Sequence, residues 1–83
     1  MNGIDYSKLR SLTAREIISS LIRDGFYLDR HSGSHHQFHH LDGRNITVSF
    51  HRSSDTFSTK ILKSMIEKQV RWTNKDLKRL KLL

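Results

Sequence analysis

Apolar residues recur at helical spacing early in the chain, at Ile17, Ile18, Leu21 and Ile22. Such a stripe predicts a helix with one face toward the core. Thr13 can cap its start, and Glu16, three residues later, can complete a capping box. Gly25 is placed to adopt the left-handed conformation that often ends a helix. We therefore predict a helix over about residues 14–24.

In the middle of the chain apolar residues occur at every second position, which is typical of strands that bury one face. Phe26 and Leu28 predict a short first strand, and His36-Gln37-Phe38 belongs to a second. Alternating residues from Ile46 to Phe50 predict a third. The second and third strands form a hairpin around Leu41-Asp42-Gly43, which has the composition of a turn.

The length of this turn sets the register of the hairpin. A two-residue Asp-Gly turn would place Phe38 opposite Thr47, whereas a three-residue loop with a left-handed Gly43 places Phe38 opposite Ile46. The second register aligns the apolar residues, so we predict it. The face toward the helices then carries His36, Phe38, His40, Ile46, Val48 and Phe50. The other face carries His35, Gln37, His39, Thr47, Ser49 and His51.

Helical spacing returns in the last third of the chain, at Ile61, Leu62, Met65, Ile66 and Val70. Ser58 or Thr59 can cap this helix, and a second capping box from Thr73 to Asp76 predicts a short C-terminal helix. The predicted fold class is α+β: helix, three-stranded antiparallel sheet, helix and short C-terminal helix, with the second sheet face open to solvent. Residues 1–83 are expected to form one domain.

The amino-acid composition excludes several classes of function. There is no cysteine, so disulfide and thiolate chemistry are excluded. No apolar run approaches the ~20 residues that cross a bilayer, and the N-terminus lacks a secretory signal pattern, so we expect a cytoplasmic protein. Residues 60–83 carry eight Lys/Arg against two Asp/Glu, compared with seven against six before them. Such a concentration of positive charge favours a polyanionic partner, although a solvated basic helix face is an equally common explanation.

Five of the six histidines lie between His31 and His40. Zinc requires ligands at about 2.0–2.1 Å, but residues four apart on a strand are separated by ~13 Å, so neither His35/His39 nor His36/His40 can chelate one ion. A site drawing on His31, His35 and His51 stays geometrically possible. We expect His36 to be partly buried and hydrogen-bonded, and His40 to be solvated. By position alone, His35 is an exposed strand residue.

Three segments of the chain resemble, in order and spacing, those of the HicA toxins, which are small mRNA interferases of bacterial toxin–antitoxin pairs. They are RDGFYLDRHSGSHHQF, HLDGRNITVSFH and DTFSTKILKSMIEKQVRWTNKDLKRL, and the resemblance covers about residues 14–80. It implies a fold like the double-stranded RNA-binding domain, which agrees with the predicted elements. It also implies an mRNA substrate and a HicB-type antitoxin. We expect no cofactor, and a monomeric free toxin.

By the same resemblance, Gly33-Ser34-His35 matches the active-site segment of the family and His35 its catalytic histidine. His51 falls at the histidine that closes the third strand, where it is either a second proton-transfer group or a structural residue. Among the basic residues, we expect phosphates to be held by Arg30, Lys60 and Lys63. Ser34 is expected to position His35 or a phosphate oxygen.

RNA supplies its own nucleophile, the 2′-hydroxyl, so cleavage by histidine acid/base chemistry requires no metal. Two other interpretations remain: a noncatalytic RNA-binding module and a protein-interaction domain that fits an acidic antitoxin. Neither needs the Gly33-Ser34-His35 loop, which therefore favours the nuclease.

Overall fold

The computed structural model describes residues 3–83, which fold as α+β in the predicted order. The elements are η1 (Tyr6–Lys8), α1 (Ala14–Arg23), β1 (Tyr27–Ser32), β2 (His35–His39), β3 (Asn45–Ser49), α2 (Thr59–Lys63), η2 (Ser64–Gln69) and α3 (Asn74–Arg79). The η1 segment is a 3₁₀ turn, and η2 continues α2 as a π-helix. The three strands form an antiparallel sheet in the order β1-β2-β3.

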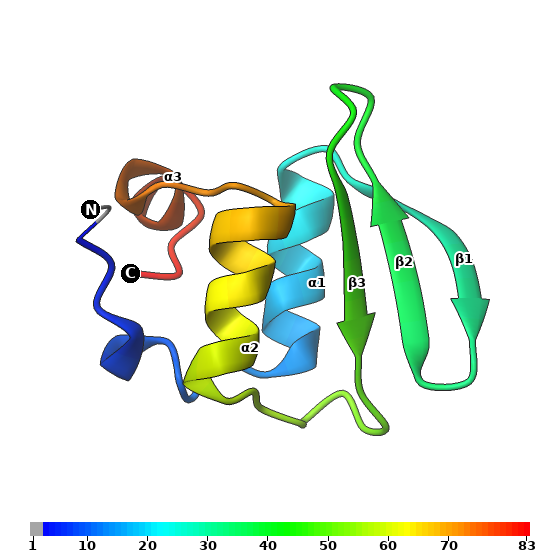
Figure 1. Ribbon diagram of the computed structural model, residues 1–83, viewed down its shortest axis with the longest axis horizontal. Helices are drawn as coiled ribbons and strands as arrows, with labels where there is room; N and C mark the ends of the chain where they lie inside the picture. The colour runs from blue at the N-terminus through cyan, green and yellow to red at the C-terminus, as the bar shows by residue number, and fades with distance from the viewer. Residues whose placement is uncertain (1–2) are drawn as a thin grey trace.

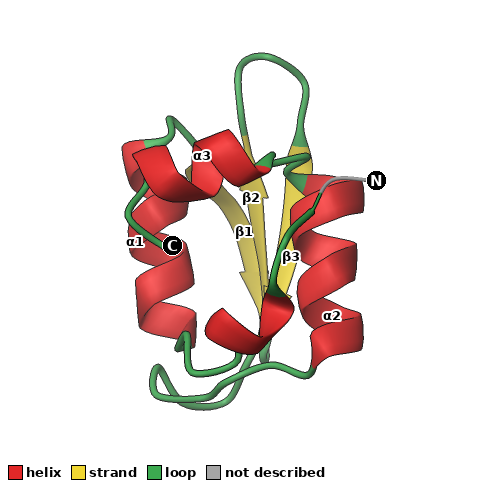
Figure 2. Ribbon diagram, turned by 90° about the vertical axis from the view of Figure 1, so that its left-hand side faces the viewer, coloured by secondary structure: helices red, strands yellow, loops and turns green. Residues whose placement is uncertain are grey.

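The helices lie on one side of the sheet and leave the other side uncovered (Figure 1). Figure 2 shows α1 and α2 flanking the molecule, with the sheet behind them and α3 in front. The predicted arrangement of helices and an open sheet face is confirmed. Because one sheet face stays in solvent, its side chains are available to a ligand.

The local signals around α1 act as predicted. Thr13 and Glu16 form the capping box, and the helix ends in a Schellman motif in which Gly25 has a φ of 101°. Ile17 and Leu21 are buried, but Ile22 is 59% exposed, so its assignment to the apolar stripe was wrong. The buried face of α1 is therefore narrower than the predicted apolar stripe and consists of Ala14, Ile17, Ser20 and Leu21.

The predicted hairpin register is confirmed. Phe38 lies opposite Ile46, His40 N–H donates to the Arg44 carbonyl at 2.9 Å, and Gly43 has a φ of 99°. The first strand extends beyond the predicted residues, to Ser32, and contains a bulge between Leu28 and Arg30.

The second helix differs from a uniform α-helix. Leu62, Met65, Ile66 and Val70 are buried as expected, whereas Ile61 is 49% exposed, which corrects its predicted place in the core. From Ser64 the helix continues as a π-helix, in which the Val70 N–H donates to the Met65 carbonyl at 2.9 Å, an i→i+5 hydrogen bond. The wider turn brings Gln69 to the sheet edge, where its side-chain oxygen accepts the Thr47 N–H at 2.9 Å.

Residues before α1 complete the core. Tyr6, Leu9 and Leu12 are buried in the same cluster as the helices and strands. The Tyr6 hydroxyl also donates to the Glu67 carboxylate on η2. The N-terminal segment, for which the sequence offered no interpretation, is therefore part of the packing.

Asp24, directly after α1, connects three other parts of the chain. Its carboxylate accepts hydrogen bonds from Trp72 Nε1 at 2.8 Å and from Arg79 at 2.9 Å, and lies 3.4 Å from an Arg44 nitrogen. Burial raises the pKa of Asp24, but these hydrogen bonds and charges together lower it below its ordinary value. The ionised carboxylate is therefore stabilised in the folded state.

We expect Asp24→Asn to lower the free energy of unfolding by about 2–3 kcal/mol near neutral pH, because hydrogen bonds to a charged group are lost. A lowered folded-state pKa stabilises the fold above the ordinary carboxyl pKa of 3.8, and this contribution disappears as pH falls through the folded-state value. The difference between wild type and variant in urea unfolding should therefore be smaller at pH 3 than near pH 7. Asp29→Asn is the control, with a change within about 0.5 kcal/mol. An equal difference at both pH values would contradict the assignment.

Candidate active site

His35 is the first residue of β2 and lies on the open face of the sheet. It pairs with Ser49 of β3, as predicted, and with Ser32 of β1. Its side chain is exposed, and its ring makes no hydrogen bond, ion pair or ring contact with any residue from 3 to 83. The imidazole is therefore free to exchange a proton with a ligand.

The turn before His35 is held by hydrogen bonds to its two carbonyl groups. His31 Nε2 donates to the Gly33 carbonyl at 2.7 Å, and His36 Nδ1 donates to the Ser34 carbonyl at 3.1 Å. The Phe50 N–H donates to the same Ser34 oxygen at 3.0 Å. Carbonyl oxygens only accept, so these contacts assign a proton to Nε2 of His31 and to Nδ1 of His36.

The two supporting imidazoles also belong to a stack on the helix side of the sheet. Ring centroids are 4.2 Å apart for His31 and His36 and again 4.2 Å for His36 and Phe50, with the planes nearly parallel. His36 is half-buried and hydrogen-bonded, as expected. Adjacent residues of β2 therefore have opposite surroundings: His36 is fixed by its neighbours and His35 is free.

His40 is a structural residue, and the expectation that it is solvated was wrong. Its Nε2 donates to the Asp24 carbonyl at 2.8 Å, and its Nδ1 accepts the Asp42 N–H at 3.0 Å. The ring fits against Gly25, where an added Cβ would lie only 2.8 Å from Nε2. The absence of a side chain at this helix end thus makes room for the histidine.

His51 lies beyond the third strand, which ends at Ser49. Its backbone N–H donates to the Asp55 carboxylate at 2.9 Å, and hydrogen bonds from Arg52 and His51 lower the pKa of that carboxyl. His51, Ser34 and Ser49 line one hollow of about 400 Å³. The structure therefore brings His51 beside the cross-strand partner of His35, while its ring stays exposed.

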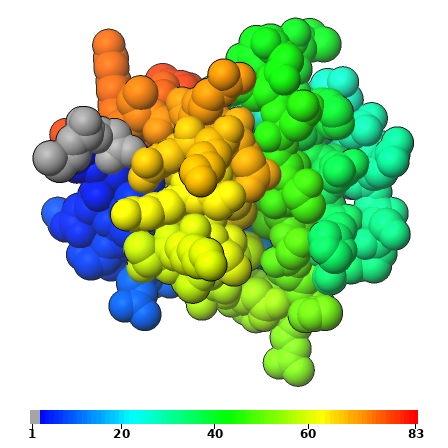
Figure 3. All heavy atoms as spheres, viewed as in Figure 1, coloured from blue at the N-terminus to red at the C-terminus, as the bar shows by residue number. Residues whose placement is uncertain are grey.

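The predicted phosphate-binding residues lie in three places. Lys60 lines a hollow of about 560 Å³ between α2 and β3. These two elements, coloured yellow and green, lie side by side on the face seen in Figure 3. Arg30 follows the bulge of β1 and pairs with Gln37 on the open face. Lys63 lies elsewhere, with its ammonium 5.7 Å from the centre of the Tyr6 ring.

Residues 3–83 contain no group of three His, Asp or Glu side chains placed to hold one metal ion. Within the same residues, no helix has the length and apolar character needed to span a bilayer.

Comparison with known families identifies the class of protein. Residues 14–72 match the family described as HicA toxin of bacterial toxin-antitoxin. The chain belongs to this family, and it is therefore a toxin of a toxin–antitoxin system with a cognate antitoxin as partner. The match contains both hairpins, His35 and α2. No curated protein and no solved structure matches the chain.

The contacts of His36 give a testable prediction about the turn. His36→Phe can keep a ring between His31 and Phe50 but removes the donor to the Ser34 carbonyl. Amide hydrogen exchange at Phe50, which shares that carbonyl, should become about fivefold faster, since one hydrogen bond contributes about 1 kcal/mol. His39→Phe, the same change on the open face, should leave this exchange unaffected. Equal exchange in wild type and His36→Phe would show that the imidazole does not restrain the turn.

Proposed function

We propose that this HicA-family toxin is a metal-independent endoribonuclease in which His35 transfers a proton to or from the RNA. The main support is the combination at one site of a free, exposed imidazole and a turn fixed by hydrogen bonds to the Gly33 and Ser34 carbonyls. A fixed backbone places the ring without occupying its nitrogens. Such preorganisation is favourable for catalysis because less reorganisation is needed when the substrate binds.

Cleavage by this route uses groups present in RNA. His35, as general base, takes the proton of the 2′-hydroxyl, and the resulting oxygen attacks the adjacent phosphorus. The bond from phosphorus to the 5′-oxygen breaks, and that oxygen receives a proton from a general acid. The products are a 2′,3′-cyclic phosphate and a 5′-hydroxyl. His51 is the candidate for the second proton transfer, because it lines the hollow that also contains Ser34.

Positive charge beside the site would hold the substrate. Lys60 reaches this region from α2, Arg30 from β1, and Lys63 is a further candidate on the same basic helix. Ser34 would orient a phosphate oxygen or the His35 ring. Contacts to phosphate position RNA without reading its sequence.

In the cell, this toxin would cleave mRNA in the cytoplasm as a monomer until its antitoxin binds. We assign the antitoxin to the HicB type, the partner implied by the family. The +7 net charge of the toxin favours an acidic partner surface as well as RNA.

Removal of the His35 imidazole tests the proposal. We expect His35→Ala to reduce RNA cleavage by purified protein at least about 100-fold, which is the lower range for loss of acid/base catalysis. Its free energy of unfolding should change by no more than about 0.5 kcal/mol, because the side chain is exposed. Ser19→Ala, at an exposed position of α1, is the control for the preparation and assay of a variant protein. A folded His35→Ala protein with full activity would refute the assignment.

The substrate supplies a second control in the same assay. Replacing the scissile 2′-hydroxyl by hydrogen should block cleavage, whereas EDTA should leave cleavage of normal RNA intact. End-group analysis should find 2′,3′-cyclic phosphate or 3′-phosphate and 5′-hydroxyl. Ends with 5′-phosphate and 3′-hydroxyl would instead indicate attack by water and refute this mechanism.

Lys60 gives a prediction for binding. Lys60→Gln should reduce the slope of log affinity against log salt by about 0.7, the value for one lost phosphate contact on single-stranded RNA. Lys63→Gln is the matched comparison, with a smaller reduction expected because its ammonium lies over the Tyr6 ring. Fluorescence anisotropy with a non-cleavable 2′-deoxy strand measures both. An unchanged slope for Lys60→Gln would place the RNA away from α2.

A further inference from the structure

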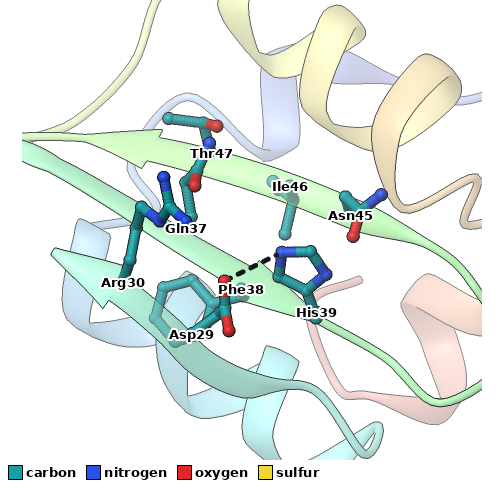
Figure 4. A pocket seen from close by; sticks show the side chains of 8 residues that line it. All are labelled: Asp29, Arg30, Gln37, Phe38, His39, Asn45, Ile46 and Thr47. Carbon is teal, nitrogen blue, oxygen red and sulfur yellow. Dashed lines mark ion pairs between the residues drawn. The ribbon is translucent and has the colours of Figure 1, made fainter.

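A third hollow lies on the open face of the sheet, further along β2 from His35. Its volume is about 330 Å³, and it spans all three strands (Figure 4). It is lined by Asp29, Arg30, Gln37, Phe38, His39, Asn45, Ile46 and Thr47. Gln37 is two residues from His35 on the same strand face, a separation of about 7 Å. The hollow is therefore a neighbour of the candidate active site.

The bulge of β1 makes this hollow more polar than a regular strand would. Side chains of consecutive strand residues normally point to opposite faces. The register shifts between Leu28 and Arg30, so Asp29 is the extra residue. As a result, both Asp29 and Arg30 line the hollow (Figure 4). Asp29 supplies a hydrogen-bond acceptor, and Arg30 supplies a positive charge.

One wall of the hollow combines an aromatic surface with a carboxylate. His39 Nε2 lies 3.3 Å from an Asp29 oxygen, as the dashed line in Figure 4 marks. Because a carboxylate oxygen accepts, this contact puts a proton on Nε2 of His39. Tyr27 stacks with His39 at 6.2 Å between centroids and is 48% exposed. Tyr27 lies outside the lining of the hollow, but its ring extends the aromatic surface of His39 at the edge of the hollow, with 29° between the ring planes.

Hydrogen-bonding groups without partners line the rest of the hollow. The side chains of Gln37 and Asn45, and the Arg30 guanidinium, make no hydrogen bond or ion pair with residues 3–83. Amides offer both donors and acceptors, as the edges of nucleobases do. Single-stranded RNA is commonly read by stacking of bases on aromatic rings and by hydrogen bonds to their edges.

We infer that this hollow is a subsite for the base of a nucleotide flanking the scissile phosphate, and that it sets the sequence preference of cleavage. The inference rests on the proposed nuclease function and extends it. The base would stack on Tyr27 and His39, with its edge bonded to Gln37 and Asn45. Arg30 would hold the adjoining phosphate. The unpaired positive charge favours a polyanion over a neutral ligand, and the distance to His35 suits a neighbour of the scissile nucleotide.

Three substitutions separate the parts of the subsite. Gln37→Met keeps the length of the side chain but removes its hydrogen bonds, and Tyr27→Phe keeps the ring that Tyr27→Ala removes. Each protein is given a pool of RNAs with randomised sequence, and the cut positions are sequenced. Ser19→Ala, on the helical side of the molecule, is the control for both rate and preference.

We expect Gln37→Met to weaken base preference at one flanking position, while cleavage still occurs. Tyr27→Ala should lower kcat/KM about tenfold on the preferred RNA, consistent with loss of one stacked base, and Tyr27→Phe should restore most of it. The fall should come mainly from KM, because His35 is intact. Thermal unfolding checks each variant, and Gln37→Met supplies the result if Tyr27→Ala is unstable.

The outcomes distinguish this subsite from the nuclease function. Wild-type cleavage with an identical base preference in Gln37→Met and Tyr27→Ala would overturn the subsite and leave the nuclease standing. If no protein cleaves, anisotropy with short 2′-deoxy strands still tests the subsite: weaker binding by Tyr27→Ala than by Tyr27→Phe supports it. Unchanged RNA binding together with reduced antitoxin binding would assign this face to the antitoxin and overturn the proposal.

Discussion

The Asp24 carboxylate is the contact on which the arrangement of elements depends. It follows α1 directly and binds Trp72, Arg79 and Arg44, which belong to the segment before α3, to α3 and to the loop between β2 and β3. Arg44 also donates to the Val70 carbonyl at 2.7 Å, at the end of the second helical segment. A buried carboxylate with several donors keeps its charge, whereas the removal of one partner leaves the others unsatisfied. One acidic residue thus fixes the ends of the helices relative to the hairpin.

Features of the fold that depend on short-range chemistry could be predicted from the sequence. The capping boxes at Thr13 and Thr73 and the left-handed Gly25 and Gly43 all require only a few neighbouring residues. The hairpin register could be predicted because side chains alternate between the two sheet faces, and a shift by one residue would no longer place Phe38 opposite Ile46. The π-helical segment and the bulge at Asp29 had no such local signal. The π-helical segment depends on the contact of η2 with the edge of β3, and the bulge depends on the pairing of β1 with β2. Both are tertiary contacts.

The same distinction applies to the candidate site. The exposed position of His35 opposite Ser49 followed from strand alternation and register. The supporting roles of His31 and His36 were missed, because they depend on hydrogen bonds to the carbonyls of a turn whose geometry the sequence leaves open. The adjacency of Gly33 to a pair of histidines was the available signal. It indicated a turn, but it did not show which rings would face it.

The cluster of histidines therefore divides by sheet face, and the division has a physical origin. On the helix side, His31 and His36 stack and donate to carbonyls of the turn, and His40 donates to the Asp24 carbonyl, so at least one nitrogen of each ring is committed to the backbone. On the open side, the His35 ring is uncommitted. Alternation along β2 lets consecutive residues take opposite roles, because His36 restrains the backbone that presents His35 to solvent. A strand can thus place a free acid/base group directly beside the residue that positions it.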